Sequence, residues 1–257
     1  MIVNRFAPLL CGALLAQAAL AQDMMMRGLD MNSPAMTQAE MTRADVETAL
    51  KSRPANLAHK KLSGLDLSGL DLTGADLTAA RLNNANLSHA KLDGAKLDQV
   101  WALKADFTGA SLKGASIFAA QLQGAKLDGA DLSGARLAAD LSGASLKGAN
   151  LSKADCSADE KNQSMGLMRA VLKSADLGDA NLAGANLARA DLQFAKFGGA
   201  DLTGAVLAGA EAGGADFRGA RLDGVNAQKL DMNSARFDKS ARDIFAQAIN
   251  LDRAFAE

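Results

Sequence analysis

The side chains best suited to chemistry in this chain are two histidines and a late cysteine, and they lie far from one another in the sequence. His59 and His89 are 30 residues apart, and Cys156 lies well beyond both. A thiol becomes a nucleophile only where a base or a positive charge lowers its pKa. Because no histidine lies near Cys156, we predict a structural thiol that packs as a small apolar group. We expect no catalytic residue, no metal site and no cofactor.

Methionine thioethers are the other side chains with coordination chemistry, and they crowd the start of the chain. The methionines in this segment are Met24, Met25, Met26, Met31, Met36 and Met41. Thioethers are soft ligands that hold Cu(I), so copper binding is one interpretation. The interpretation that we favour is a flexible, methionine-rich linker over residues 22–36.

A five-residue repeat from Asn56 to Phe237 must position all of these groups. It is plainest from Leu65 to His89, which read LDLSG LDLTG ADLTA ARLNN ANLSH. Leucines five residues apart form no stripe on a helix, where five residues turn about 500°, and they alternate faces on a strand. Short extended pieces joined by corners fit the period, and glycine is frequent at the fifth place, where the backbone must turn sharply. A fixed short period predicts a solenoid.

Individual repeats resemble the consensus A(D/N)LXX of the pentapeptide-repeat family. ADLTG at Ala200, ANLAG at Ala180 and ADLSG at Ala130 match it without adjustment, and the resemblance covers most of the chain. It implies an all-β solenoid, a right-handed quadrilateral β-helix with four repeats in each coil. On such a coil His59 and His89, six repeats apart, lie on opposite sides and share no metal.

The interior of this β-helix is predicted to be closed. Central leucines facing alanines leave no space for a ligand, and Asp and Glu fall at outward polar places of the repeat. Phe197, Phe217 and Phe237 recur at one spacing, so we expect them to stack in one internal column. Binding or catalysis in a buried pocket is therefore not expected.

The repeat loses its register at two places. The central leucines step by four residues at Ala138–Ala139, which predicts a tightened corner. Residues 157–164, SADEKNQS, leave the pattern, which resumes at Leu167 and Leu172. Both breaks are interpreted either as tolerated irregularities or, for the loop, as a partner contact, because function on rigid scaffolds concentrates in loops. The loop residues that we single out as candidate contacts are Asp159, Glu160 and Lys161.

Both ends of the solenoid need protection, because an open coil exposes strand edges. The capping-box pattern from Thr37 to Glu40 predicts an N-terminal capping helix over residues 37–54. After the repeats, Ile244, Ala248 and Leu251 begin an apolar stripe at helical spacing. A C-terminal capping helix over residues 238–257 is therefore expected, and it is also a possible dimer contact.

The first 21 residues have the composition of a secretory signal peptide. Arg5 precedes an apolar stretch, and Ala19 and Ala21 form a small-residue cleavage pattern. Cys11 lies in the apolar stretch, but the residues before it lack the small side chain of a lipoprotein processing site. We predict that the mature chain is periplasmic or secreted, with no membrane span after cleavage.

The outward charges of the repeats bear on the class of partner. The resemblance implies one class, because some family members imitate DNA with an acidic surface and bind a type II topoisomerase. From residue 55 to residue 237 this chain has 20 Lys or Arg and 20 Asp or Glu. One outward column alternates in sign through Asp176, Lys196, Asp216 and Arg236. A short acidic column contains Asp191, Glu211 and Asp231. DNA mimicry therefore stays an alternative, and nucleic-acid binding is not expected.

An outward aromatic residue is the main candidate for a protein contact. Trp101 stands where the consensus has Asp or Asn, in a column with Lys61, Arg81 and Gln121, and Phe118 lies near the adjoining corner. Such a residue is either an isolated surface aromatic or part of a contact patch. We predict a non-catalytic, exported scaffold or protein-binding module of the cell envelope, whose protein partner the sequence does not identify.

Overall fold

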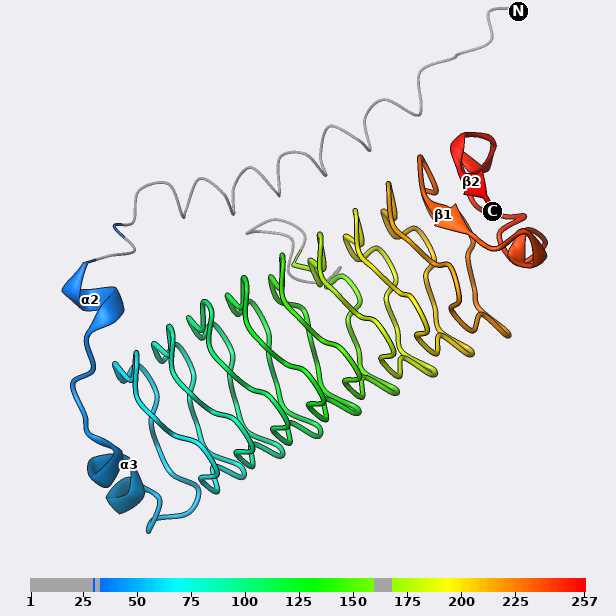
Figure 1. Cartoon of the computed structure of the whole chain (residues 1–257). Helices are drawn as coiled ribbons and strands as arrows, with labels where there is room; N and C mark the ends of the chain where they lie inside the picture. Colours follow the sequence, from blue (N-terminus) through cyan, green and yellow to red (C-terminus); the bar gives the residue numbers. More distant parts are fainter. Residues whose placement is uncertain (1–29, 31–32, 160–167) are drawn as a thin grey trace, which may run out of the picture.

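The computed structural model of the chain describes residues 30, 33–159 and 168–257, and most of them wind into one long coil (Figure 1). The named elements are short and lie at its two ends. They are α2 (Pro34–Thr37), α3 (Arg43–Ala49), β1 (Arg236–Phe237), η1 (Lys239–Ala241), η2 (Leu251–Arg253) and β2 (Phe255–Ala256). Strands β1 and β2 pair in parallel, with Arg236 opposite Phe255.

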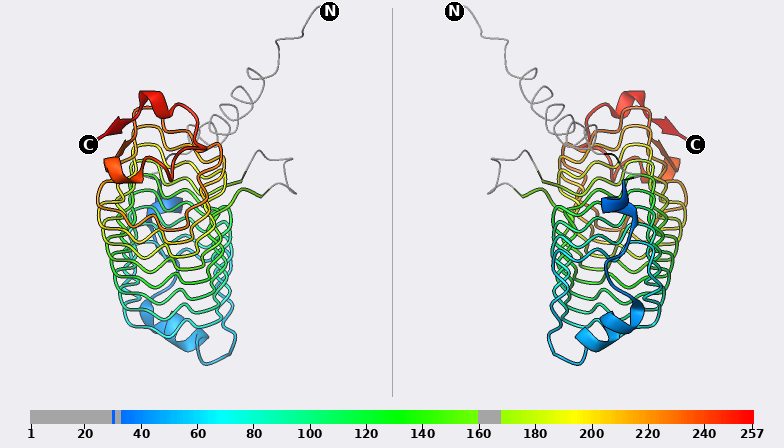
Figure 2. Two further views of the ribbon diagram at one scale, coloured as in Figure 1. Left: turned by 90° about the vertical axis from the view of Figure 1, so that its right-hand side faces the viewer. Right: turned by 90° about the vertical axis from the view of Figure 1, so that its left-hand side faces the viewer.

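Four ladders of parallel bridges run along the coil, one on each side. Their first bridges are Asn56–Asp76, Lys61–Arg81, Asp66–Asn86 and Asp71–Lys91. Each of these bridges spans 20 residues, and neighbouring ladders begin five residues apart. Four repeats therefore complete one coil, as the family resemblance implied. Figure 2 shows these coils stacked between the residues of α3 and the C-terminal elements.

Leucine and alanine side chains fill the inside of the coil, and backbone hydrogen bonds join one coil to the next. Leu82 is fully buried, and its amide donates to the carbonyl of Trp101 at 2.6 Å. The Trp101 amide donates back to the carbonyl of Ala80 at 2.9 Å. Because buried backbone groups must be paired, each coil has to repeat the shape of its neighbour.

The acidic residues of the repeat have a structural role that the sequence did not indicate. The carboxylate of Asp71 accepts a hydrogen bond from the Thr73 amide at 3.1 Å, and that of Asp76 accepts one from the Thr78 amide at 3.0 Å. These hydrogen bonds satisfy the amide at the start of each corner. Hydrogen bonds from Thr73 and then from Arg53 lower the pKa of Asp71 to about 2. Many outward acids are therefore parts of corners and not only solvated filler.

The ladder shortens where the sequence predicts the first register break. Gln121 pairs with Asp140, 19 residues on, so the corner at Ala138–Ala139 lacks one residue. At corners of full length a backbone hydrogen bond closes the turn, for example from the Ala80 amide to the Leu77 carbonyl. The corner at Ala138–Ala139 is therefore tighter than these, as its shorter spacing predicts.

At the second break the chain leaves the coil and returns. Asp140 pairs with Val171, 31 residues on. The Asp159 amide donates to the Met168 carbonyl at 2.7 Å, and this antiparallel bridge forms the neck of the loop. The predicted contacts Glu160 and Lys161, and Leu167, lie outside the described residues, as do the predicted signal peptide and most of the methionine-rich segment.

The N-terminal end is covered by a shorter helix than the sequence predicted. The capping box belongs to Thr42 and Asp45, which begin α3, and the predicted helix start at Thr37 is wrong. The reason is that the Glu40 amide donates to the Lys61 carbonyl at 2.9 Å, so this part of the chain binds the open edge of the coil. Val46 of α3 is fully buried and closes the core.

The predicted C-terminal helix is wrong, because residues 238–257 continue the coil instead. The Ile249 amide donates to the Leu230 carbonyl at 2.8 Å, and the Phe255 amide donates to the Ala235 carbonyl at 2.8 Å. Asn250, with a φ of 58°, turns the chain between these contacts. Backbone groups of this segment pair with a strand edge that would otherwise be open. This pairing stabilises the chain more than the helix that the spacing of the apolar side chains favours.

Aromatic rings fill the core near this end. The ring centroids of Phe197 and Phe217 lie 4.8 Å apart with the rings almost parallel, which confirms this part of the predicted column. Phe245 is fully buried, with its centroid 5.3 Å from that of Phe237 and 5.7 Å from that of Phe217. Phe245 therefore closes the C-terminal end of the core.

We expect Phe245→Ala to destabilise the last coils by about 3–5 kcal/mol, because it opens a cavity at the end of the aromatic column. Hydrogen exchange should show lost protection around Leu230 and Phe237, while coils near α3 keep theirs. Phe255→Ala is the matched control, since Phe255 is 54% exposed and should change protection little. Equal effects of the two substitutions would contradict the closing role of Phe245.

Candidate functional site

One side of the coil collects most of the outward residues that do not fit the repeat. We call it the Trp101 face, and it is defined by the ladder Lys61, Arg81, Trp101, Gln121, Asp140, Val171, Asp191, Glu211, Asp231 and Ile249. The predicted contacts Lys61, Arg81 and Trp101 are consecutive in this ladder, and all three side chains are half-buried. Their role as partner contacts stays a prediction.

Two other predicted contacts border the Trp101 face. Phe118 is half-buried and follows Ser116 of the neighbouring Asn56 ladder, and its amide donates to the carboxylate of Asp98 at 2.9 Å. Asp159 lies at the neck of the loop, which leaves the coil between the Asn56 ladder and the Trp101 face.

The Trp101 face carries large apolar side chains where the repeat normally has small or polar ones. They are Trp101, Leu103, Val171, Phe194 and Ile249. On the opposite side, the ladder that begins with Asp71 has no large apolar residue at an outward place in its described part. Phe194 is 56% exposed and Ile249 is 49% exposed. Large outward apolar patches often mark a protein contact, and here the large apolar side chains are spread along one side of the coil.

Charges of opposite sign lie at the two ends of the Trp101 face. Lys61, Arg81 and Lys104 are near α3, whereas the other end has Asp191, Glu211 and Asp231. The sequence indicated an acidic column and a tryptophan column but not that they are one ladder. The two register breaks explain the error, because together they shift the later repeats by half a coil relative to an unbroken count.

A shallow hollow of about 270 Å³ lies at the acidic end of the Trp101 face. Phe194, Glu211, Gly213, Gly214 and Asp231 are among the residues that line it. A Cβ added at Gly214 would lie 2.6 Å from two carbons of the Phe194 ring. The exposed Phe194 ring therefore packs over Gly214, beside the hollow. Phe194 at a corner place usually held by glycine was a signal available in the sequence.

Arg169 joins the returning end of the loop to the acidic residues. Its Nη1 lies 2.8 Å from Glu211 Oε1, and its Nη2 lies 3.6 Å from Asp191 Oδ2. The Arg169 side chain is 9% exposed, and burial raises the pKa of Asp191 above its ordinary value. Arg169 therefore offsets part of the negative charge and ties the loop to the face. Sequence analysis missed this residue, because the loop hides which ladder it adjoins.

The segment from Met36 to Glu40, which we call the strap, crosses the basic end of the Trp101 face before α3 begins. The Asn83 side chain donates to the Met36 carbonyl of the α2 region at 3.1 Å, and Glu40 binds the edge at Lys61. Asn83 is 4% exposed and Met36 is 5% exposed. The strap therefore adds a layer of chain over the basic end of the face, whereas the acidic end has a hollow.

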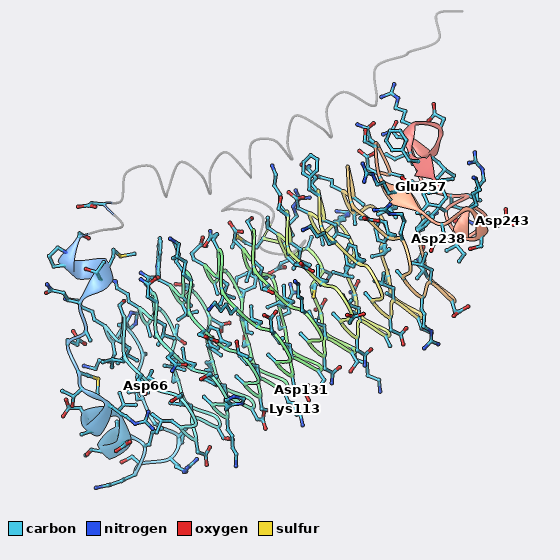
Figure 3. All side chains as sticks on the ribbon, viewed as in Figure 1. Asp66, Lys113, Asp131, Asp238, Asp243 and Glu257 are labelled. Atoms are coloured by element: carbon cyan, nitrogen blue, oxygen red, sulfur yellow. The ribbon has the colours of Figure 1, made fainter. Side chains whose placement is uncertain are left out.

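The other sides of the coil show interleaved charge. Asp176, Lys196, Asp216 and Arg236 are successive members of one ladder, as the sequence predicted. On a further side Lys113 Nζ lies 3.4 Å from Asp131 Oδ2, and the two labelled side chains lie close together in Figure 3. Such pairs contribute little to stability individually, but they cancel the field of a continuous acidic surface.

The residues with intrinsic chemistry are kept apart. His59 follows the Asn56 ladder and His89 follows the Asp66 ladder, so they stand at different corners. Cys156 is fully buried, and burial raises the pKa of its thiol to about 12. Within the described ranges, no three His, Cys, Asp or Glu side chains are grouped to hold a metal ion. None of the helices in the described part of the chain is long and apolar enough to cross a membrane.

Comparisons with known proteins agree with this architecture. The family model described as pentapeptide repeats matches the chain in 8 copies, over residues 61–99, 104–134, 115–155, 167–204 and 200–238. The chain is similar to HetL, a pentapeptide repeat protein involved in heterocyst differentiation regulation from the cyanobacterium Nostoc sp. strain PCC 7120. The two share 30% identity with a TM-score of 0.36, covering 76% of this chain and 97% of HetL.

A second similar structure is that of trypsin-treated QnrB1, a plasmid-mediated fluoroquinolone resistance protein. It is 18% identical with a TM-score of 0.54, covering 68% of this chain and 82% of QnrB1, which shows a common fold. No curated protein matches the chain.

We expect the Cys156 thiol of the folded protein to react with a disulfide reagent at pH 8 far more slowly than the same thiol after denaturation. A pKa of about 12 leaves almost no thiolate at that pH, and burial blocks access. Mass spectrometry after timed labelling measures the difference. Labelling of the folded chain at the denatured rate would contradict the structural role of Cys156.

Proposed function

Because this chain belongs to the pentapeptide-repeat family, whose members fold as right-handed quadrilateral β-helices and are generally non-catalytic scaffolds, we propose that it is an exported, non-catalytic protein-binding module of the cell envelope. It acts as a rigid rod, and a protein partner binds its outer surface. The proposal has two parts, the location of the chain and the surface that it uses.

Export is supported by residues 1–21, whose charge, apolar stretch and small-residue pattern are those of a secretory signal peptide. A single cysteine after residue 21, buried in the core, also suits an oxidising compartment, because no exposed thiol is left to form unwanted disulfides. The mature protein is proposed to lie in the periplasm or outside the cell.

The Trp101 face is the proposed binding surface, and the gathering of outward apolar side chains on it is the observation that carries this proposal. Trp101 and Leu103 lie beside positive charge, and Phe194 lies beside negative charge. Aromatic side chains ringed by polar groups are typical of the residues that dominate binding energy in protein interfaces. Asp159, at the neck of the loop, lies beside this face, and partner contacts through Glu160 and Lys161 stay a prediction.

Imitation of DNA toward a type II topoisomerase is the alternative function. The shared fold with QnrB1 is compatible with it, but the distribution of charge on the described surface opposes it. A DNA mimic needs a long run of negative charge. Here the acidic end of the Trp101 face is short, contains Arg169, and continues into Lys61 and Arg81. Copper binding by the methionine segment, most of which lies outside the described residues, and a dimer through the C-terminal end stay predictions.

A photoreactive amino acid in place of Trp101 should give crosslinked products with other protein in the periplasmic or secreted fraction of intact cells. The same probe at Lys91, on the opposite side of the coil, is the control and should give few. Equal products from both positions would argue against the Trp101 face. A chain found only in the cytosolic fraction would overturn export.

The purified chain should leave a fluoroquinolone-inhibited DNA gyrase supercoiling reaction unchanged, because its surface lacks a continuous acidic run. The same reaction without the drug serves as the positive control. Restored supercoiling on addition of the chain would favour the alternative function.

A further inference from the structure

We propose that the hollow at the acidic end of the Trp101 face binds an arginine side chain of the protein partner. This inference rests on the proposed function, because it adds a chemical feature to the partner of that face. It is carried by two groups that line the hollow, the exposed ring of Phe194 and the carboxylate of Asp231. An aromatic ring attracts a cation to its face, and a carboxylate forms its strongest hydrogen bonds with a charged donor.

The hollow lies at the end of the face that the strap leaves uncovered. The strap binds Asn83 and the coil edge at Lys61, whereas Asp231 is near the other end of the ladder. Phe194 is 56% exposed, so much of its ring is open to a ligand. The volume of about 270 Å³ is slightly less than the roughly 300 Å³ at which small-molecule sites begin. This size suits a single side chain better than a whole cofactor.

Asp231 holds one carboxylate oxygen in place and leaves the other open. Its Oδ1 accepts hydrogen bonds from the Asn233 amide at 3.0 Å and from Asn250 Nδ2 at 2.8 Å. No residue in the described part of the chain donates to its Oδ2, and no lysine or arginine there forms an ion pair with it. Arg253 is near, since its carbonyl accepts from the Ser234 amide, but it is exposed and does not pair with Asp231. The Asp231 carboxylate is therefore a fixed acceptor that still lacks a cation.

The unused hydrogen-bonding groups of the hollow are acceptors. Arg169 already binds Glu211 through two nitrogens, at 2.8 Å and 3.1 Å, and offsets its charge. Gln193 Nε2 donates to Glu211 at 3.2 Å, whereas none of the described residues donates to the amide oxygen of Gln193. A guanidinium has several N–H donors and no acceptor. It therefore matches a hollow whose open oxygens belong to Gln193 and Asp231.

The spacing of the ring and the carboxylate favours arginine over lysine. The Phe194 ring packs over Gly214, which belongs to the coil of Glu211, and Asp231 is the next member of the ladder. Along the coil axis the ring and the carboxylate are therefore about one coil spacing, roughly 4.8 Å, apart. A planar guanidinium stacks on a ring while its edge donates to a carboxylate at such a distance. An ammonium group concentrates its charge at one point and does not reach both groups equally.

An NMR titration of the isotopically labelled full chain tests the proposal with a defined probe. N-acetyl-arginine methylamide, added at low salt up to about 10 mM, should give saturable shifts of the Gly213 and Gly214 amide signals. The citrulline derivative has nearly the same shape without the charge, so we expect it to bind at least about fivefold more weakly. The lysine derivative should also bind more weakly than the arginine derivative.

Two substitutions separate the ring from the carboxylate. Phe194→Ala and Asp231→Asn should each weaken binding of the arginine derivative at least about fivefold. Both variants should fold. Ala79 and Ala119 already adopt the corner conformation of Phe194, with φ of 55° against 59°. Asparagine at position 231 keeps the oxygen that accepts from the Asn233 amide.

Asp201→Asn is the matched control. Asp201 lies on the opposite side of the coil, in the ladder that begins with Asp71. Its carboxylate accepts from the Thr203 amide at 2.9 Å, and Arg221 Nη1 lies 3.3 Å from its Oδ2. It thus has the corner role of Asp231 with its cation already supplied. This substitution should leave the affinity for the arginine derivative unchanged.

The absence of a saturable shift overturns this inference. Equal affinity for the arginine derivative and either of the other two overturns it as well, as does binding that survives both substitutions in the hollow. Crosslinks from position 101 to another protein test the proposed function separately. If they form while the titration fails, the Trp101 face keeps its proposed role and only the arginine site is lost.

Discussion

The spacing of backbone hydrogen bonds between coils is the constraint on which the rest of this structure depends. The amide of each central leucine must reach a carbonyl of the next coil, as Leu82 reaches Trp101 at 2.6 Å. Since this requires every coil to have the same outline, most inward side chains of the described coils are leucine or alanine, with a few aromatic and other apolar residues among them. Variation in size and charge is therefore found at the outward places of the ladders.

Most of the fold could be predicted from the sequence because its unit is local. The positions of Leu, Ala and Gly in five residues state which side chains point inward and where the chain turns, and the aromatic pair Phe197–Phe217 follows from spacing alone. What the sequence could not supply is the number of residues that leave the coil at an interruption. A 19-residue step and a 31-residue step decide that Asp191 shares a ladder with Trp101. The identity of the candidate site thus depended on the two places where the local rule fails.

The ends were predicted less well for a related reason. Helical spacing of apolar residues near Ile244 and a capping-box pattern at Thr37 are real local preferences, but an open coil edge offers unpaired carbonyls and amides. Pairing those groups decided the outcome at Ile249, Phe255 and Glu40, each of which bonds to the coil through its backbone. Local propensity predicts an element only where no neighbouring edge competes for the same backbone groups. Phe245, which closes the core, was hidden within the predicted helix.

The pKa values of the outward acids differ between the regular corners and the acidic end of the Trp101 face. Asp71 and Asp76 accept hydrogen bonds from corner amides, and their lowered pKa values record that engagement. Asp191 differs, because burial raises its pKa and Arg169 is drawn in beside it. The Asp191 carboxylate nevertheless accepts a hydrogen bond from the Gln193 amide at 3.0 Å, so it closes its corner as Asp71 and Asp76 do. A buried carboxylate needs a neighbour that offsets its charge, and Arg169 lies beside this one. Burial beside Arg169, and not the lack of a corner role, therefore distinguishes Asp191 from the acids of the regular corners.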